Sequence, residues 1–206
     1  MTSNKTIFFI IGILLIILGL FMLIPYSVQN LFNENSHSFL ASSFITIFIG
    51  VLFVLTNLQN EYRLNLKQTF LFSTFAWIAI AIFGSIPFAL SSLEFSLSDS
   101  FFESMSGITT TGSTIITDLD SAPKSILLWR ALMQWLGGIG IIVMAITVFP
   151  LLKVGGMQLF KVDSSDNPEK ILPRTIEIAS IIISTYLVLT VLCAFFYWIS
   201  GMKIFD

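Results

Sequence analysis

The stretch that decides the fold is residues 98–114, which read SDSFFESMSGITTTGST. Its first part, Ser98–Gly107, has the pattern of a short helix, and its second part, Thr109–Thr114, is small and polar. A helix of about ten residues is about 15 Å long, half of the roughly 30 Å hydrocarbon core of a bilayer. Residues 91–124 nevertheless lie between two long apolar runs. We therefore expect residues 91–124 to form a re-entrant segment that enters and leaves the membrane on one side.

The short helix carries its own start signal. Ser98 or Ser100 can cap its first turn, and Ser100 with Glu103 has the spacing of a capping box. The expected apolar face of this helix consists of Phe101, Phe102 and Met105.

Five apolar runs are long enough to cross a membrane as helices. They cover residues 7–24, 39–58, 69–90, 125–152 and 176–200. Hydrophobic residues make up 55% of the 206 residues and charged residues only 11%, whereas soluble domains carry about 25% charge. The first run follows Lys5 as a signal peptide would, but its length and the lack of a cleavage pattern favour a retained helix ending at Pro25-Tyr26. The composition predicts an all-α membrane protein.

The residues after the short helix fit an ion filter. A helix that ends inside the membrane presents the negative end of its dipole there, which favours a cation. Carbonyls of an extended segment can replace the hydration shell of an ion. Gly112 can take backbone angles barred to other residues, and the hydroxyls of Thr110 and Thr111 could add ligands or brace the segment. The alternative is a polar surface turn, which the position between two spans disfavours.

The distribution of charge predicts the orientation, with the N-terminus in the cytoplasm. One set of connections holds seven of the ten basic residues: Lys5, Arg63, Lys67, Lys153, Lys161, Lys170 and Arg174. The opposite side holds the acidic residues Glu34, Glu94, Asp99, Glu103, Asp118, Asp120 and Asp206. These carboxylates either raise the local cation concentration at a pore mouth or are ordinary loop residues.

The fourth run contains a charge and three glycines. An unpaired Arg130 at mid-bilayer would cost about 2.5–3.5 kcal/mol. We expect it to pair with Glu103 or with pore-helix carbonyls and so to support the filter, unless it extends to the headgroups. Gly137, Gly138 and Gly140 either allow close helix packing or form a gating hinge.

Three motifs together closely resemble the Trk-type potassium uptake family, within the Trk/Ktr/HKT superfamily. They are FFESMSGITTTG at 101–112, LWRALMQWLGGIG at 128–140 and VGGMQLF at 154–160. The resemblance covers nearly the whole chain. It implies a fold of four repeats, each an outer helix, a pore loop and an inner helix, around one potassium pathway.

The resemblance also implies a division of the chain and a set of site residues. The expected parts are a helix pair at 1–66, a first repeat at 67–153, and a cytoplasmic connection with the first helix of an incomplete second repeat at 154–206. The implied filter consists of Thr110, Thr111, Gly112 and Ser113, with potassium bound by the backbone carbonyls of Thr110 and Thr111. A homodimer and a cytosolic nucleotide-binding regulatory subunit, docked on the inner connection, are implied as partners. The alternative to a docking role is that the inner connection is an ordinary solvated loop.

The expected function is potassium transport across the bacterial inner membrane, with coupling to Na+ or H+ left open and no other cofactor. The chain offers one filter strand where a ring needs about four, so we expect an N-terminal fragment rather than a complete short protein. The alternative is a non-transporting membrane scaffold. An enzyme is disfavoured because the runs lack paired carboxylates, a His pair or an activated Ser. The lone His37 and Cys193 support neither a zinc site nor a disulfide, and nothing resembles a nucleotide loop or implies a nucleic-acid partner.

Overall fold

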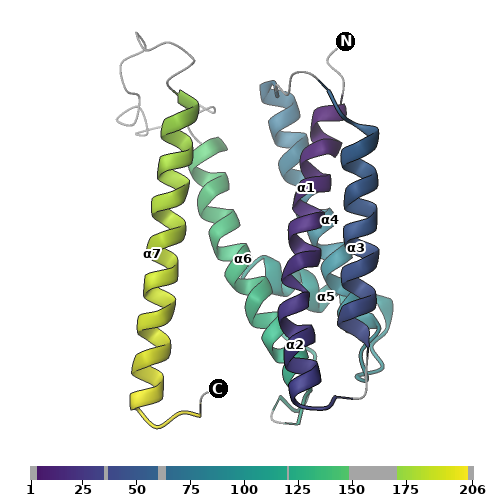
Figure 1. Cartoon of the computed structure of the whole chain (residues 1–206), viewed down its shortest axis with the longest axis vertical. Helices are drawn as coiled ribbons and strands as arrows, with labels where there is room; N and C mark the ends of the chain where they lie inside the picture. Colours follow the sequence, from purple (N-terminus) through teal and green to yellow (C-terminus); the bar gives the residue numbers. More distant parts are fainter. Residues whose placement is uncertain (1–3, 35–36, 60–63, 120, 149–170, 204–206) are drawn as a thin grey trace. The chain divides into compact units, whose positions relative to one another are not determined.

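Every regular element that the structure describes is an α-helix (Figure 1). The computed structural model describes residues 4–34, 37–59, 64–119, 121–148 and 171–203. The helices are α1 (Lys5–Phe21), α2 (Leu23–Leu31), α3 (Ser38–Thr56), α4 (Leu66–Ala89), α5 (Leu97–Ile108), α6 (Lys124–Val148) and α7 (Ile171–Ile199). The chain divides into two compact units, Met1–Gly138 and Ile139–Asp206, and α6 runs from the first into the second. The predicted all-helical class is confirmed.

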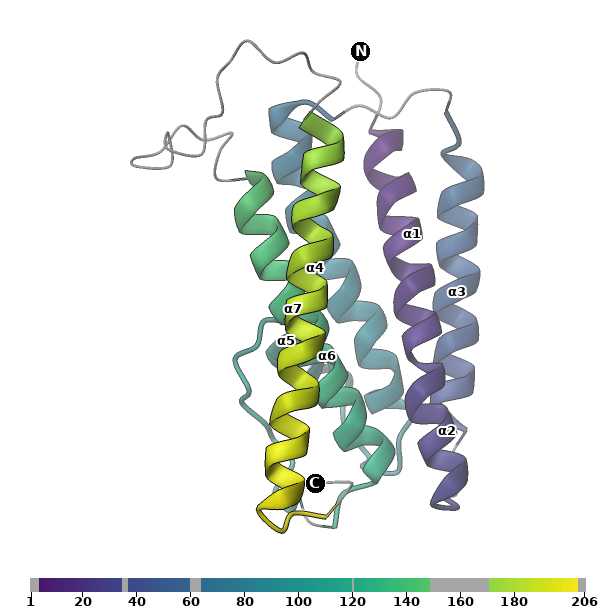
Figure 2. The same cartoon turned by 60° about the vertical axis from the view of Figure 1, so that its left-hand side comes forward.

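Five helical segments of the described chain are long and apolar enough to cross a membrane. They overlap all five predicted runs, and near the N-terminus α1 and α2 together form a segment of 27 residues. The fourth segment covers Lys124–Ile142, whereas the predicted run extends to residue 152, beyond the described part of α6. The predicted end at Pro25-Tyr26 is wrong, because α2 continues to Leu31. Pro25 lies in the first turn of α2, where its missing N–H and its fixed φ are tolerated. α5 is much shorter than α4 and α6 (Figure 2).

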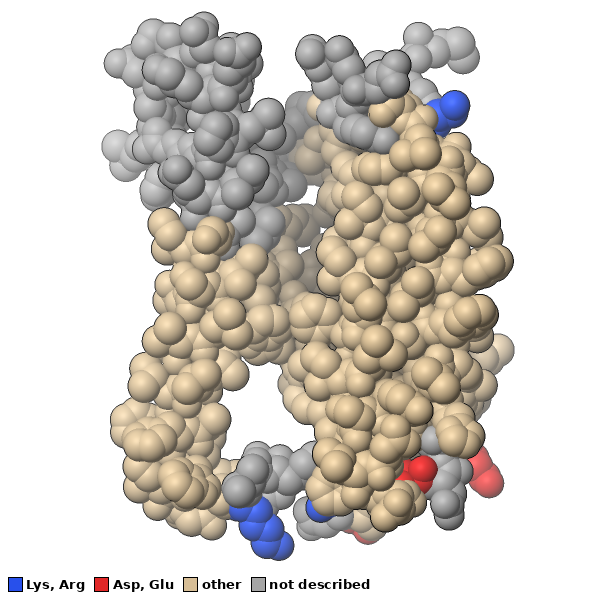
Figure 3. Space-filling model, in the orientation of Figure 1, with Lys and Arg blue, Asp and Glu red and all other residues tan. Residues whose placement is uncertain are grey.

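The first unit has an uncharged band around its middle on the face that Figure 3 shows. The described Lys, Arg, Asp and Glu side chains visible on this unit lie at its two ends. A charged side chain exposed to hydrocarbon would cost several kcal/mol, so a membrane-spanning surface keeps such groups at the headgroup level. The surface therefore agrees with the span assignment made from helix length.

Small residues bring α1 and α3 into close contact. A Cβ on Gly12 would lie 2.7 Å from the carbonyl oxygen of Gly50, and a Cβ on Gly50 would lie 2.8 Å from that of Gly12. Further along the same pair, the Ser43 hydroxyl donates to the Gly19 carbonyl at 2.7 Å. In lipid, helices associate through such close van der Waals packing and interhelical hydrogen bonds, because apolar surface alone gives no preference for protein over lipid.

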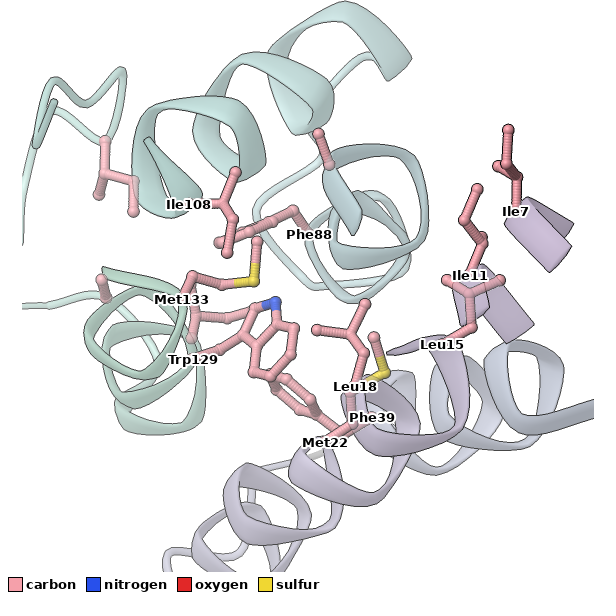
Figure 4. Close-up of a cluster of buried hydrophobic side chains, with 14 residues drawn as sticks. Ile7, Ile11, Leu15, Leu18, Met22, Phe39, Phe88, Ile108, Trp129 and Met133 are labelled. Atoms are coloured by element: carbon pink, nitrogen blue, oxygen red, sulfur yellow. The ribbon is translucent and has the colours of Figure 1, made fainter. Parts of the chain in front are cut away.

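Trp129 of α6 lies at the centre of the apolar core (Figure 4). Its side chain is fully buried, and its ring packs edge-on against Phe39 of α3 with centroids 6.1 Å apart. Its Nε1–H donates to the carbonyl of Gly84 in α4 at 3.0 Å, which satisfies the only polar group of the indole. Trp129 therefore fixes α6 to both the N-terminal helix pair and α4.

The second unit contains the end of α6 and the whole of α7. None of the side chains described in α7 is buried, and Cys193 among them is an exposed free thiol. The VGGMQLF motif, the connection at 153–170 and the predicted start of a second pore helix at 204–206 lie outside the described residues. The predicted three-part division of the chain stays a prediction.

Candidate functional site

The helix of the predicted re-entrant segment is α5, and it begins at a different cap from the predicted one. Its N-cap is Ser96, whose hydroxyl accepts from the backbone N–H of Asp99 at 3.2 Å. The Asp99 carboxylate in turn accepts from the backbone N–H of Ser96 at 3.2 Å, which completes a capping box. The predicted box of Ser100 and Glu103 is wrong, because both residues lie inside the helix. The Glu103 carboxylate therefore does not cap α5 and can form hydrogen bonds elsewhere.

The buried face of α5 is polar and small. Phe101 and Phe102, predicted as its apolar face, are 37% and 45% exposed. The buried residues are instead Ser100, Glu103, Ser104, Ser106, Gly107 and Ile108. This face lets α5 approach α6 closely, since a Cβ on Gly137 would lie 1.9 Å from the Ile108 carbonyl oxygen. The packing interpretation of the glycine run thus holds for Gly137, while Gly138 and Gly140 are only half-buried and a hinge role stays a prediction.

The chain leaves α5 through a tight C-terminal turn. Thr110 N–H donates to the Gly107 carbonyl at 3.0 Å, and Thr111 N–H donates to the Ser106 carbonyl at 3.0 Å. These two bonds are those of a Schellman motif, which places its turning residue in the left-handed region. That residue is Thr110, with φ +58°. The extended segment therefore begins at Thr111 rather than at Thr109.

Thr110 is expected to store backbone strain. A β-branched residue at positive φ is an outlier, and the left-handed region costs a non-glycine residue about 1–2 kcal/mol. We predict that the protein with Thr110→Gly is more stable than that with Thr111→Gly by about 1–2 kcal/mol, since Thr111 is not at positive φ. Unfolding of the two purified variants in detergent measures this difference. Equal stabilities would show that Thr110 is not strained.

Glu103 and Arg130 together fix the extended segment through an ion pair and hydrogen bonds to it. The Glu103 side chain is fully buried and accepts from Arg130 Nε at 2.8 Å. The same carboxylate accepts from the Thr114 hydroxyl and the Ile115 N–H, each at 2.6 Å. Arg130 also donates through Nη2 to the Ser113 carbonyl at 3.3 Å. A buried ion pair is stable only when further hydrogen bonds satisfy it, and here those bonds come from the loop.

The four predicted filter residues differ in how their carbonyls are used. The Ser113 carbonyl accepts from Arg130 and also from the Ser106 hydroxyl at 2.6 Å. In the part of the chain that the structure describes, no donor reaches the carbonyls of Thr110, Thr111 or Gly112. All four residues are exposed in the chain as it stands. Three successive residues thus present unused carbonyls on a segment that is anchored at both ends.

Position 112 favours glycine because of its backbone angle more than because of a lack of space for a side chain. Its φ is +78°, a region that L side chains rarely adopt. Among the described residues beyond its chain neighbours, the one atom that a Cβ added there would meet is Gln134 Nε2 of α6, at an ordinary contact distance of 3.6 Å. A substitution at Gly112 therefore changes the direction of the backbone carbonyls before it creates a clash.

The structure brings together the sequence-predicted residues Glu103, Arg130 and Ser113. It shows the predicted contact between Glu103 and Arg130 and a second contact from Arg130 to the Ser113 carbonyl, and the Arg130 side chain is only 11% exposed. Sequence reasoning missed Ser106 as a support, since a serine inside a helix gives no signal of a contact seven residues ahead. It also missed Ser96, although Ser96 and Asp99 have capping-box spacing.

Taken together, the fold and the site define a multi-pass, all-helical membrane protein with a braced polar loop after a short helix. Residues 35–205 match the family model TrkH, a cation transport protein. The chain belongs to this family, whose members are transporters rather than enzymes, and the resemblance seen in its motifs is confirmed.

Two curated relatives are named as Trk system potassium uptake proteins. TrkI of Halomonas elongata is 40% identical over 198 residues, which are 96% of this chain and 40% of that protein. TrkH of Escherichia coli (strain K12) is 37% identical over 203 residues, which are 96% of this chain and 42% of that protein. The crystal structure of the potassium transporter TrkH from Vibrio parahaemolyticus matches with a TM-score of 0.85 at 34% identity, over 100% of this chain and 41% of that one. This chain spans about two fifths of the length of the relatives it matches.

Proposed function

We propose that this chain takes part in potassium transport across the bacterial inner membrane and contributes one filter strand to a Trk-type uptake system. The observation that carries the proposal is the braced loop. Residues 110–112 present unused carbonyls, while Glu103 and Arg130 hold the residues that follow them. A loop held in this way can keep its carbonyls at a fixed spacing when an ion enters or leaves.

The chemistry of the loop suits a weakly held cation. α5 ends at Ile108, so the negative end of its dipole lies next to the loop. The Glu103 carboxylate is neutralised by Arg130 and so adds no net charge that would trap an ion. Conduction requires binding that is strong enough for entry and weak enough for release. The carbonyls of Thr110 and Thr111 are the proposed potassium ligands. Gly112 is the third residue of the strand whose carbonyl accepts no hydrogen bond from the described residues.

One strand does not surround an ion. We propose that filter strands from further repeats complete the carbonyl ring around the ion. The N-terminus is proposed to be cytoplasmic, on the basis of the basic residues on its side of the membrane. A homodimer and a cytosolic nucleotide-binding subunit remain proposals drawn from the family resemblance. Both a channel and a carrier coupled to Na+ or H+ fit the loop.

Rubidium uptake measures the proposed function. The complete open reading frame that encodes the chain would be expressed in bacteria that lack their own potassium uptake systems. We expect growth at low potassium, and rubidium uptake that potassium suppresses more strongly than sodium does. A membrane scaffold, the alternative function, would give no uptake above the empty-vector control at equal abundance in the membrane. That result would contradict the proposal.

A further inference from the structure

The N-terminus of α6 is capped by a residue far away in the sequence. α6 begins at Lys124, directly after Pro123, which has no side-chain oxygen with which to cap the helix. The first backbone N–H groups of a helix have no partner within it and need one from outside. Glu34, on the connection between α2 and α3, supplies it: its carboxylate accepts from the backbone N–H of Ser125 at 3.2 Å. It also accepts a short hydrogen bond from the Ser125 hydroxyl.

The connection that carries Glu34 is held in place on both sides. The backbone N–H of Glu34 donates to the carbonyl of Gln29 at 3.0 Å, and this hydrogen bond links Glu34 to α2. Beside it, the Lys124 ammonium lies 4.0 Å from the centre of the Phe32 ring. A carboxylate at a helix N-terminus is also favoured by the helix dipole. The N-terminal helix pair thus contacts the start of α6 through two neighbouring pairs of side chains.

The cap from Glu34 acts on α6, which is the helix that carries Arg130. Arg130 follows Ser125 by five residues, about 7.5 Å along the helix axis. Arg130 donates to both Glu103 and Ser113, so an axial shift or rotation of α6 would move it relative to the loop. The buried positions Ser125, Trp129 and Met133 are spaced by four residues and lie along one face of α6. This face sets the rotation of α6, while Glu34 fixes its end.

We propose that Glu34 is a positioning residue for the filter loop. By capping α6, its carboxylate fixes Arg130 against Ser113 and Glu103, and so couples the N-terminal helix pair to the geometry of residues 110–113. The inference rests on the proposed function of that loop. It gives the N-terminal pair a role in ion selection besides its packing.

Three variants, expressed from the complete open reading frame, distinguish an effect of Glu34 on the filter loop from an effect on the stability of the protein. Glu34→Ala removes the cap, Ser125→Ala removes one of its two hydrogen bonds, and Glu34→Gln keeps an oxygen that can still accept. We expect Glu34→Ala to change the ratio of rubidium to sodium uptake by about fivefold, the equivalent of one lost helix cap. Glu34→Gln and Ser125→Ala should give smaller changes. Uptake is compared at equal abundance in the membrane, so a mere loss of folded protein does not alter the ratio.

A second readout follows the loop directly. The Ile115 N–H is held by Glu103, so its hydrogen exchange should become about fivefold faster in Glu34→Ala. The matched control is Glu94→Ala, which removes another carboxylate, exposed on the connection between α4 and α5, and should alter neither readout. In an Arg130→Lys background, Glu34→Ala should add little, because both changes act through the same contact.

The outcomes distinguish this inference from the proposed function. If Glu34→Ala keeps the wild-type uptake ratio and exchange rate while Gly112→Ser alters the ratio, the positioning role is wrong and the filter stands. If Gly112→Ser also leaves the ratio unchanged, both proposals fall. Should Glu34→Ala not accumulate, Glu34→Gln and Ser125→Ala decide by the same ratio, and wild-type values in both would overturn the role.

Discussion

Replacing Arg130 with Gln is expected to destabilise the first unit by about 3–5 kcal/mol, the cost of leaving a buried charge without its partner. Glu103 is fully buried, and Gln at position 130 cannot neutralise it. The Ser113 carbonyl would lose one of its two donors at the same time. We therefore expect less folded protein in the membrane, and altered ion selectivity in the fraction that folds. Unfolding of the purified protein and competition of sodium with rubidium uptake measure the two effects.

Two further variants show whether the charge pair is the cause. The double variant Glu103→Gln with Arg130→Gln removes both charges, so it should be more stable than Arg130→Gln alone. Lys203→Gln removes an exposed positive charge and should have no effect. Unchanged uptake and selectivity in Arg130→Gln would mean that Arg130 does not support the filter.

Replacing Gly112 with Ser is expected to reduce the preference for potassium and rubidium over sodium. The backbone at φ +78° costs a non-glycine residue about 1–2 kcal/mol. If the loop relieves this strain by turning its carbonyls, the selectivity ratio should fall by about 5–30-fold. Competition between ions during rubidium uptake measures the ratio at equal abundance in the membrane. A scaffold protein would show no such change.

Gly201 offers a matched control for this substitution. It also has a positive φ, +95°, and among the described residues other than its two chain neighbours, none has an atom within 4 Å of the position that a Cβ would take. Gly112→Ala and Gly201→Ala therefore introduce the same kind of backbone strain at two places, and only the first should alter selectivity. Equal effects of the two would show that strain in general, and not the filter loop, determines the ratio.

The sequence alone was enough to find the spans and the short helix between them. Both depend on local properties: the number of successive apolar residues, and the need of every backbone group in lipid for a partner inside its own helix. The second, third and fifth runs therefore agree with the observed segments to within four residues at each end. The predicted end of the first run at Pro25 is wrong, because a proline in the first turn of a helix is tolerated, whereas one further inside removes a hydrogen bond and kinks or ends the helix. Hydropathy also does not show that α1 ends and α2 begins at Met22, three residues before Pro25.

The contacts of the candidate site needed the tertiary structure. The charge of Arg130 predicts a partner such as Glu103, because burying a lone charge is costly whatever the fold. Its second contact, to the Ser113 carbonyl, depends on where the chain turns at Thr110. The cap from Glu34 to Ser125 joins residues 91 positions apart.

The sequence by itself determined the class of the protein, its spans and the place of its polar loop, since each follows from residues adjacent along the chain. Only the packing of α5 against α6, and of the α2–α3 connection against the start of α6, decided which groups hold that loop. Hydrogen bonds act over about 3 Å, so their partners are known only when the helices that carry them have been placed.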